Sequence, residues 1–80
     1  MGYKWKLDFG GFTLEVRKPE HGVKHCHAVK HPDCEAVFSL EDGSLLEYPK
    51  GFSARDLKAI SKAILANQKL LLDTWSKLNG

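Results

Sequence analysis

The sequence predicts an α+β fold in which an antiparallel sheet of about four to five strands packs against one long C-terminal helix. Residues 1–50 alternate between apolar and polar side chains with the two-residue period of strands, whereas residues 53–78 carry apolar side chains at helical spacing. Turn-forming residues divide the first part into two hairpins and a short further strand. The 80 residues allow one domain, with the sheet in residues 1–50 and the helix in residues 53–78.

The first hairpin is centred on Gly10-Gly11, a dipeptide suited to the positive φ angles of a two-residue loop. A loop of this length brings six apolar side chains together in three cross-strand pairs. The pairs are Phe9–Phe12, Leu7–Leu14 and Trp5–Val16. All six side chains then share one face of the sheet, so the turn and the hydrophobic pattern agree.

A second hairpin is expected from about Lys24 to Glu41, with its turn at Pro32-Asp33. If the loop has two residues, the histidines of the first strand share a face with apolar side chains of the second. That face carries His25, His27, Val29, His31, Cys34, Ala36, Phe38 and Leu40. On the other face Lys30 lies near Glu35, and a longer turn would change these pairings. Residues 45–48 are expected to form a short fifth strand that ends at Pro49.

The helix begins at Ser53, whose hydroxyl can accept a hydrogen bond from a free amide of the first turn. Asp56 complements the positive end of the helix dipole, and Phe52 can pack onto Leu57. One helix is expected to continue to residue 78, with a single stripe facing the sheet. The stripe consists of Leu57, Ile60, Ile64, Gln68, Leu71, Trp75 and Leu78.

A second stripe lies roughly opposite and consists of Ala59, Ala63, Ala66 and Leu70, edged by lysines. One interpretation is a solvated face rich in helix-forming residues. The other is a docking strip for a protein partner, because small side chains permit close approach. A homodimer formed through this strip, or through the sheet edge at Pro49, is a further alternative.

The composition excludes some classes of protein. The formal charge of +2 comes from interspersed basic and acidic residues and lacks the basic stripe of a dedicated nucleic-acid binder. No apolar run approaches the roughly 18 residues of a membrane span, and the N-terminus lacks the apolar segment of a secretion signal. Two cysteines are too few for a disulfide framework. We therefore expect a cytoplasmic protein with free thiols and no membrane association.

Candidate functional residues cluster at the start of the second hairpin, where all four histidines lie within eleven positions. Imidazole and thiolate bind zinc, and the candidate ligands are His25, His27, His31 and Cys34. Their spacing matches no standard zinc motif. Zinc is the one cofactor that these residues indicate. A second hypothesis treats His25 and His27 as a catalytic pair that moves protons during RNA hydrolysis. The third interpretation is structural, with both rings half-buried beside Phe38 and Leu40.

The chain resembles a family of small bacterial and phage proteins, domain-of-unknown-function family 4160. The resemblance runs through His25-Cys26-His27, residues 35–40, Gly51-Phe52-Ser53, Asp56-Leu57, Asn67, Leu70-Leu71-Leu72 and Trp75. Val23-Lys24 stands where the family usually has two prolines, and Cys26 stands where it has Val or Ile. The resemblance implies a role beside a small protein of a second uncharacterised family, 2442, in a type II toxin–antitoxin module.

These observations give three hypotheses of function. The first is a partner-binding protein that resembles a component of a toxin–antitoxin module. Within this hypothesis the chain is the toxin, with RNA as its target. A ribonuclease-like enzyme and a non-enzymatic binding protein are both alternatives. The second is a phage-encoded, non-enzymatic inhibitor of a host defence or of another macromolecule. The third is a zinc-binding structural domain.

Overall fold

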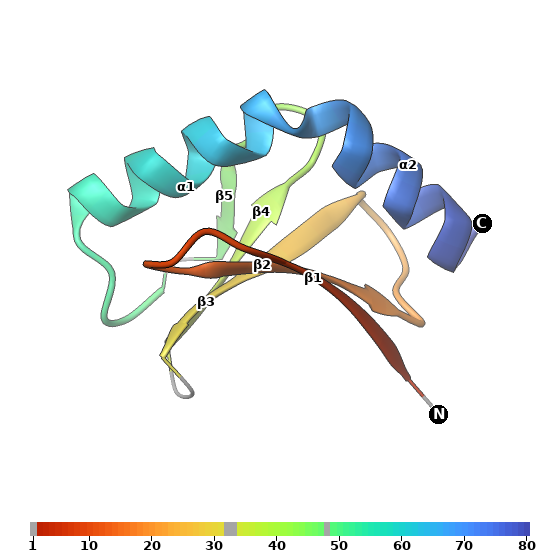
Figure 1. The fold of residues 1–80 in the computed structure, drawn as a ribbon, viewed down its shortest axis with the longest axis horizontal. Coiled ribbons are helices and arrows are strands. Elements are labelled where there is room, and N and C mark those ends of the chain that lie inside the picture. Colours follow the sequence, from red (N-terminus) through yellow and green to blue (C-terminus); the bar gives the residue numbers. More distant parts are fainter. Residues whose placement is uncertain (1, 32–33, 48) are drawn as a thin grey trace.

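The computed structural model describes residues 2–31, 34–47 and 49–80, apart from the side chain of His31. Within these residues the chain forms five strands followed by two helices. They are β1 (Tyr3–Asp8), β2 (Thr13–Lys18), β3 (His25–His31), β4 (Cys34–Ser39), β5 (Leu45–Glu47), α1 (Ala54–Ala66) and α2 (Gln68–Asn79). The strands form one antiparallel sheet in chain order, and both helices cross the same face of it (Figure 1). The predicted α+β fold is therefore confirmed.

The first hairpin has the predicted register. Trp5 pairs with Val16 and Leu7 with Leu14, and the N–H of Phe9 donates to the carbonyl of Phe12 at 2.9 Å. Gly10 has a φ of +87°, which a residue with a side chain rarely adopts. The turn residue and the apolar alternation therefore determine this hairpin together.

The second hairpin departs from the predicted register. His31 pairs with Cys34 as expected, but a bulge between Val29 and His31 shifts the remaining pairs by one residue. Cys26 therefore pairs with Phe38 and His27 with Val37, whereas the predicted pairing was His27 with Phe38. The predicted turn at Pro32-Asp33 lies outside the described residues.

A shift of one residue moves every side chain of a strand to the other face. Cys26 and Ala28 are fully buried beneath the helices, and His25 and His27 point to the opposite face. The shift is favourable because the small apolar side chains enter the core while the imidazoles reach polar partners. The predicted Lys30–Glu35 contact is also wrong, because Lys30 binds Asp56 at 2.7 Å.

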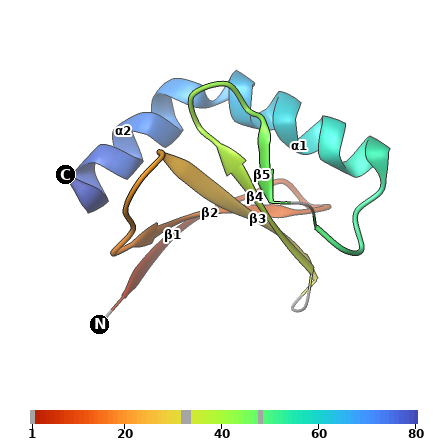
Figure 2. The same ribbon diagram turned by 180° about the vertical axis from the view of Figure 1, so that it is seen from behind.

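The predicted single helix over residues 53–78 is divided at Asn67 into α1 and α2. Asn67 has φ −119° and ψ 22°, and its side-chain amide donates to the carbonyl of Ala63 at 2.8 Å. Asparagine side chains compete in this way with the helical backbone. The resulting bend, visible in Figures 1 and 2, keeps both helices over the sheet. Gln68 follows the bend and donates to the carbonyls of Leu40 and Glu41.

The apolar stripe nevertheless faces the sheet as predicted. Ile60, Ile64, Leu71 and Trp75 are buried, and Leu57 and Leu78 pack against them. The remaining core residues are Leu14, Val16, Cys26, Ala28, Ala36, Phe38 and Leu40. In the part of the chain that the structure describes, neither helix is long and apolar enough to cross a membrane.

The start of α1 also follows the prediction. Ser53 Oγ accepts from the N–H of Asp56, and Asp56 Oδ2 accepts from the N–H of Ser53, both at 3.1 Å. The two residues form a capping box, which satisfies two otherwise free amides. The salt bridge from Lys30 links this cap to the sheet.

We expect Asp56→Asn to destabilise the protein at pH 7 and to have little effect at pH 2. Hydrogen bonds from Lys30 and Ser53 hold the pKa of Asp56 below its ordinary value. The folded state therefore favours the carboxylate, whose contribution is present above about pH 4 and is lost as the pH falls through the lowered pKa. Thermal melts of both proteins at the two pH values provide the measurement. A difference in melting temperature that stays constant with pH would contradict this role for Asp56.

Candidate functional site

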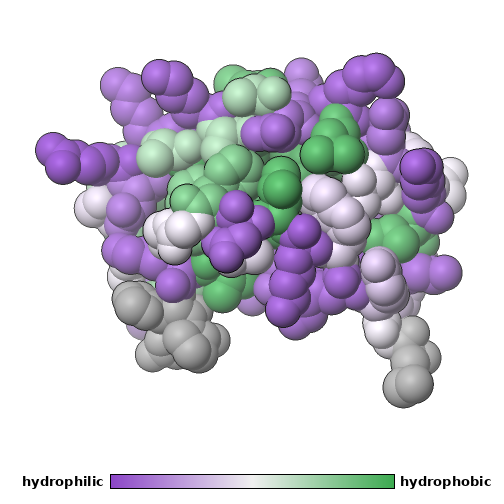
Figure 3. Space-filling view, in the orientation of Figure 1, coloured by the Kyte–Doolittle hydropathy of each residue, from purple (hydrophilic) through white to green (hydrophobic). Residues whose placement is uncertain are grey.

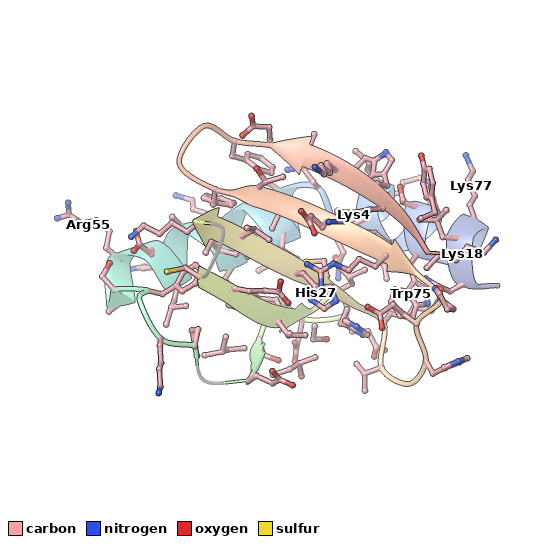
Figure 4. The ribbon with its side chains drawn as sticks, turned by 90° about the horizontal axis from the view of Figure 1, so that it is seen from below. Lys4, Lys18, His27, Arg55, Trp75 and Lys77 are labelled. Carbon is pink, nitrogen blue, oxygen red and sulfur yellow. The ribbon has the colours of Figure 1, made fainter. Side chains whose placement is uncertain are left out.

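The sheet face opposite the helices carries a cluster of charged and imidazole side chains. In the view of this face in Figure 4, His27 lies near the middle of the sheet and Trp75 lies toward one end. Glu15 is only 6% exposed and His27 only 9% exposed, although they point away from the helices. Because their own polar neighbours cover them, the cluster is a partly dehydrated polar site.

Arg17 on β2 lies between two carboxylates. Its Nη2 is 2.8 Å from Glu15 Oε1 and 2.8 Å from Glu35 Oε1, and its Nη1 is 3.2 Å from Glu35 Oε2. The hydrogen bonds from Arg17 are the main reason that the pKa of Glu35 lies below its ordinary value. Glu35 is therefore a carboxylate at neutral pH, and it accepts from Nδ1 of His27 at 3.0 Å.

The loop between β2 and β3 supplies a third carboxylate to the cluster. Glu20 Oε1 lies 2.8 Å from Nε2 of His27 and 3.5 Å from Nε2 of His25. Burial alone would raise the pKa of Glu20, but the hydrogen bond with His27 and the proximity of His25 outweigh it, and the net pKa is lowered. The end of α2 positions this loop, because Asn79 accepts from the N–H of Glu20 and donates to the carbonyl of Arg17.

His25 is oriented from two sides. Its Nδ1 lies 2.7 Å from the carbonyl oxygen of Val23, and its ring packs on Trp75 with centroids 4.9 Å apart. The ring of His27 is 5.3 Å away in an edge-on arrangement. The C-terminal helix therefore contributes to the site through Trp75 as well as through Asn79.

The structure brings together some of the predicted site residues and separates others. His25 and His27 are adjacent, but they do not lie beside Phe38 and Leu40, because the bulge turns them to the other face. Cys34 begins β4 near Gly51, at the far end of the hairpin from His25. His31 has no described side chain. Among the described side chains, Cys34 therefore does not join His25 and His27 in one ligand set.

Cys26 is excluded as a thiolate ligand or nucleophile by its position. Its side chain is fully buried on the helix side of the sheet, and burial raises the pKa of its thiol to about 12. At neutral pH it is a protonated core residue.

Sequence reasoning missed Glu20 and Glu35 as members of the site. Glu20 belongs to a loop, where no periodicity indicates the direction of a side chain. Glu35 was assigned to the opposite face because the predicted register lacked the bulge. An acidic residue shortly before a His-x-His strand was the one available signal for Glu20.

The geometry bears on the catalytic hypothesis for the two histidines. In each ring both nitrogens lie within 3.5 Å of a protein oxygen. A general acid–base pair needs nitrogens that can reach a substrate, and here such contact would require Glu20 to move. RNA cleavage by His25 and His27 stays a prediction.

The second stripe is accessible on the outer side of the helices. Ala59, Ala66 and Leu70 are exposed and Ala63 is half-buried. A shallow hollow beside them is lined by Ala54, Arg55, Lys58, Ala59 and Lys62. Figure 3, which views the molecule from the side with the helices at the top, shows apolar side chains among hydrophilic ones in its upper half. We call Ala59, Ala63, Ala66 and Leu70 the alanine strip.

Comparison with known protein families finds a match. The model of a family described as a domain of unknown function (DUF4160) matches residues 12–76. This region contains β2 to β5, α1, most of α2 and all the residues of the polar cluster. No curated protein and no solved structure matches the chain.

Proposed function

Because this chain belongs to the DUF4160 family, we propose that it binds a protein partner as one component of a two-protein module of the toxin–antitoxin kind. The observation that supports partner binding most directly is the accessible alanine strip. Leu70 at its end is 46% exposed, whereas the apolar stripe on the other side of the helices is packed on the sheet. The module itself is what the family resemblance implies.

The charge around the strip defines the kind of partner. The helical segment, residues 54–80, carries five basic and two acidic side chains, a net charge of +3, whereas the preceding residues carry seven basic and eight acidic ones. Both acidic side chains of the helices are engaged, Asp56 with Lys30 and Asp73 with Lys69. Arg55, Lys58 and Lys62 line the hollow beside Ala59, so this end of the strip has a basic border.

An apolar strip with a basic border suits an amphipathic helix whose flanks are acidic. A second copy of this chain would bring two basic borders together, which like-charge repulsion disfavours. We therefore propose an acidic partner helix, and the product of the neighbouring gene is the partner to test.

We expect Ala59→Glu and Ala63→Glu each to weaken binding of that partner by at least about tenfold, because a carboxylate in the strip would face an acidic and apolar surface. The measurement is calorimetric titration with the purified neighbouring protein. In cells, the neighbouring protein should relieve growth inhibition caused by the wild-type chain and fail to relieve that caused by either variant.

Ser76→Glu is the matched control, since Ser76 is an exposed position of α2 outside the strip. It should bind like the wild type, and all three variants should retain the wild-type melting temperature. Unchanged affinity in both alanine variants would remove the strip from the proposal. If the wild-type chain self-associates and does not bind the neighbouring protein, a homodimer replaces the proposed complex.

A further inference from the structure

The polar cluster contains three electron-pair donors that converge on one point. One ring nitrogen of His25, one of His27 and a carboxylate oxygen of Glu20 all lie within 4.8 Å of one another, and Nε2 is the nitrogen of each ring that faces Glu20. They come from two neighbouring segments, the loop before β3 and the start of β3. Such convergence requires a proton or a metal ion between the atoms, because lone pairs directed at one another repel.

The other nitrogen of each ring shows which atoms are free to donate an electron pair. Nδ1 of His25 lies 2.7 Å from the carbonyl oxygen of Val23, and a carbonyl oxygen can only accept, so Nδ1 carries the proton. Nδ1 of His27 lies 3.0 Å from Glu35 Oε2, a carboxylate oxygen that also accepts. Both rings therefore donate outward through Nδ1, so Nε2 is the nitrogen of each ring that can bind an ion when a metal displaces the proton shared with Glu20.

Arg17 approaches the same nitrogen of His27. Its Nη1 lies 3.2 Å from Nδ1 of His27 and 3.2 Å from Glu35 Oε2. The guanidinium can only donate, so this contact alone would make Nδ1 an acceptor, but the shorter contact of 3.0 Å with the Glu35 carboxylate places the Nδ1 proton toward Glu35. Arg17 thus positions the Glu35 carboxylate, and this carboxylate determines which tautomer His27 adopts.

We propose that Glu20, His25 and His27 bind one divalent transition-metal ion, with zinc as the favoured ion. Metal-binding histidines generally donate their second ring N–H to a carboxylate or a backbone carbonyl, and both types of acceptor are present here. Two imidazoles and a carboxylate are a ligand set that zinc uses.

The distances fit a single ion. Zinc bonds of about 2.0–2.1 Å in a tetrahedron hold the ligand atoms roughly 3.3 Å apart. The separations from Glu20 Oε1 are 2.8 Å to Nε2 of His27 and 3.5 Å to Nε2 of His25, and the three ligand atoms lie within 4.8 Å of one another, so side-chain rotations can bring them to this geometry.

The site is of the open type. Structural zinc sites are closed by four protein ligands, whereas three protein ligands leave a position for water or substrate. Among the described residues, the cluster offers three ligand groups, and the Glu20 side chain is 24% exposed. A bound ion therefore keeps a position that solvent can reach, which distinguishes this site from the closed structural site considered from the sequence.

The test is zinc titration of the full chain, prepared without chelator and without a polyhistidine tag. We expect one zinc per chain by calorimetry, a higher melting temperature with zinc, and a visible absorption band when cobalt is used as the probe. Glu20→Gln keeps the size and hydrogen bonding of the side chain and should weaken zinc binding more than about 100-fold. Glu35→Gln leaves the three ligands in place and should weaken it about 10- to 100-fold.

His21→Ala is the matched control, because His21 is exposed in the same loop and does not belong to the cluster. Its zinc affinity should equal that of the wild type. Circular dichroism establishes that Glu20→Gln remains folded. The proposal is overturned if the wild type takes up no zinc, or if zinc binds Glu20→Gln as tightly as it binds the wild type. The partner-binding proposal is independent of both outcomes.

Discussion

Replacing Ile64 with alanine should lower the free energy of unfolding by about 3 to 4 kcal/mol. Ile64 is fully buried in the core cluster, and truncation removes apolar contacts and leaves a cavity that the rigid sheet cannot fill. A domain of this size has a total stability of roughly 4 to 12 kcal/mol. The variant should therefore melt roughly 15 to 25 °C below the wild type.

Urea unfolding and thermal melts measure this effect, and Leu70→Ala provides the comparison. Leu70 lies on the other side of the same helical segment and is 46% exposed, so its truncation should change stability by no more than about 0.5 kcal/mol. Similar losses in the two variants would mean that the helices do not pack on the sheet as the structure shows. Leu70→Ala should instead weaken partner binding, which separates the roles of the two helix faces.

The parts of the fold that the sequence predicted correctly are those that depend on local chemistry. The first hairpin follows from Gly10-Gly11 and the alternation on both sides of it, and the helix start follows from Ser53 and Asp56. The break at Asn67 was not predicted, because the apolar stripe keeps its period from Ile64 to Leu71 across the break. Periodicity reports which side is buried and is insensitive to a local bend.

The prediction of the candidate site depended on the register between β3 and β4, which differs from the predicted one by one residue. Period two along a strand placed His25 and His27 together correctly, but only the bulge before His31 puts Glu35 on their face. Glu20 is positioned by Asn79, which is 59 residues away in the chain. Neither the bulge nor this long-range contact leaves a signal in the local pattern, so the histidines were predicted and their carboxylate partners were not.

Arg17→Met should lower the free energy of unfolding by about 2 to 3 kcal/mol. Glu15 is 6% exposed, and without Arg17 its nearest cation is Lys4, whose Nζ lies 3.8 Å away. When a largely buried carboxylate loses its charged hydrogen-bond partner, the loss of stability exceeds the stability that the pair contributed. The reason is that the remaining charge stays desolvated. Lys4→Met, at a side chain that is 49% exposed, should cost no more than about 0.5 kcal/mol.

A double-mutant cycle tests whether the loss arises from the unpaired Glu15. Glu15→Gln combined with Arg17→Met should recover about 1 to 2 kcal/mol relative to the sum of the single losses, since no buried charge is left without its partner. Denaturant unfolding of the four proteins measures this coupling energy. If the two losses simply add, water solvates the Glu15 carboxylate well enough without Arg17. The cluster is then a network of solvent-exposed ion pairs. If they do not add, β2 holds a desolvated ion pair whose arginine also orients Glu35, and through Glu35 the ring of His27.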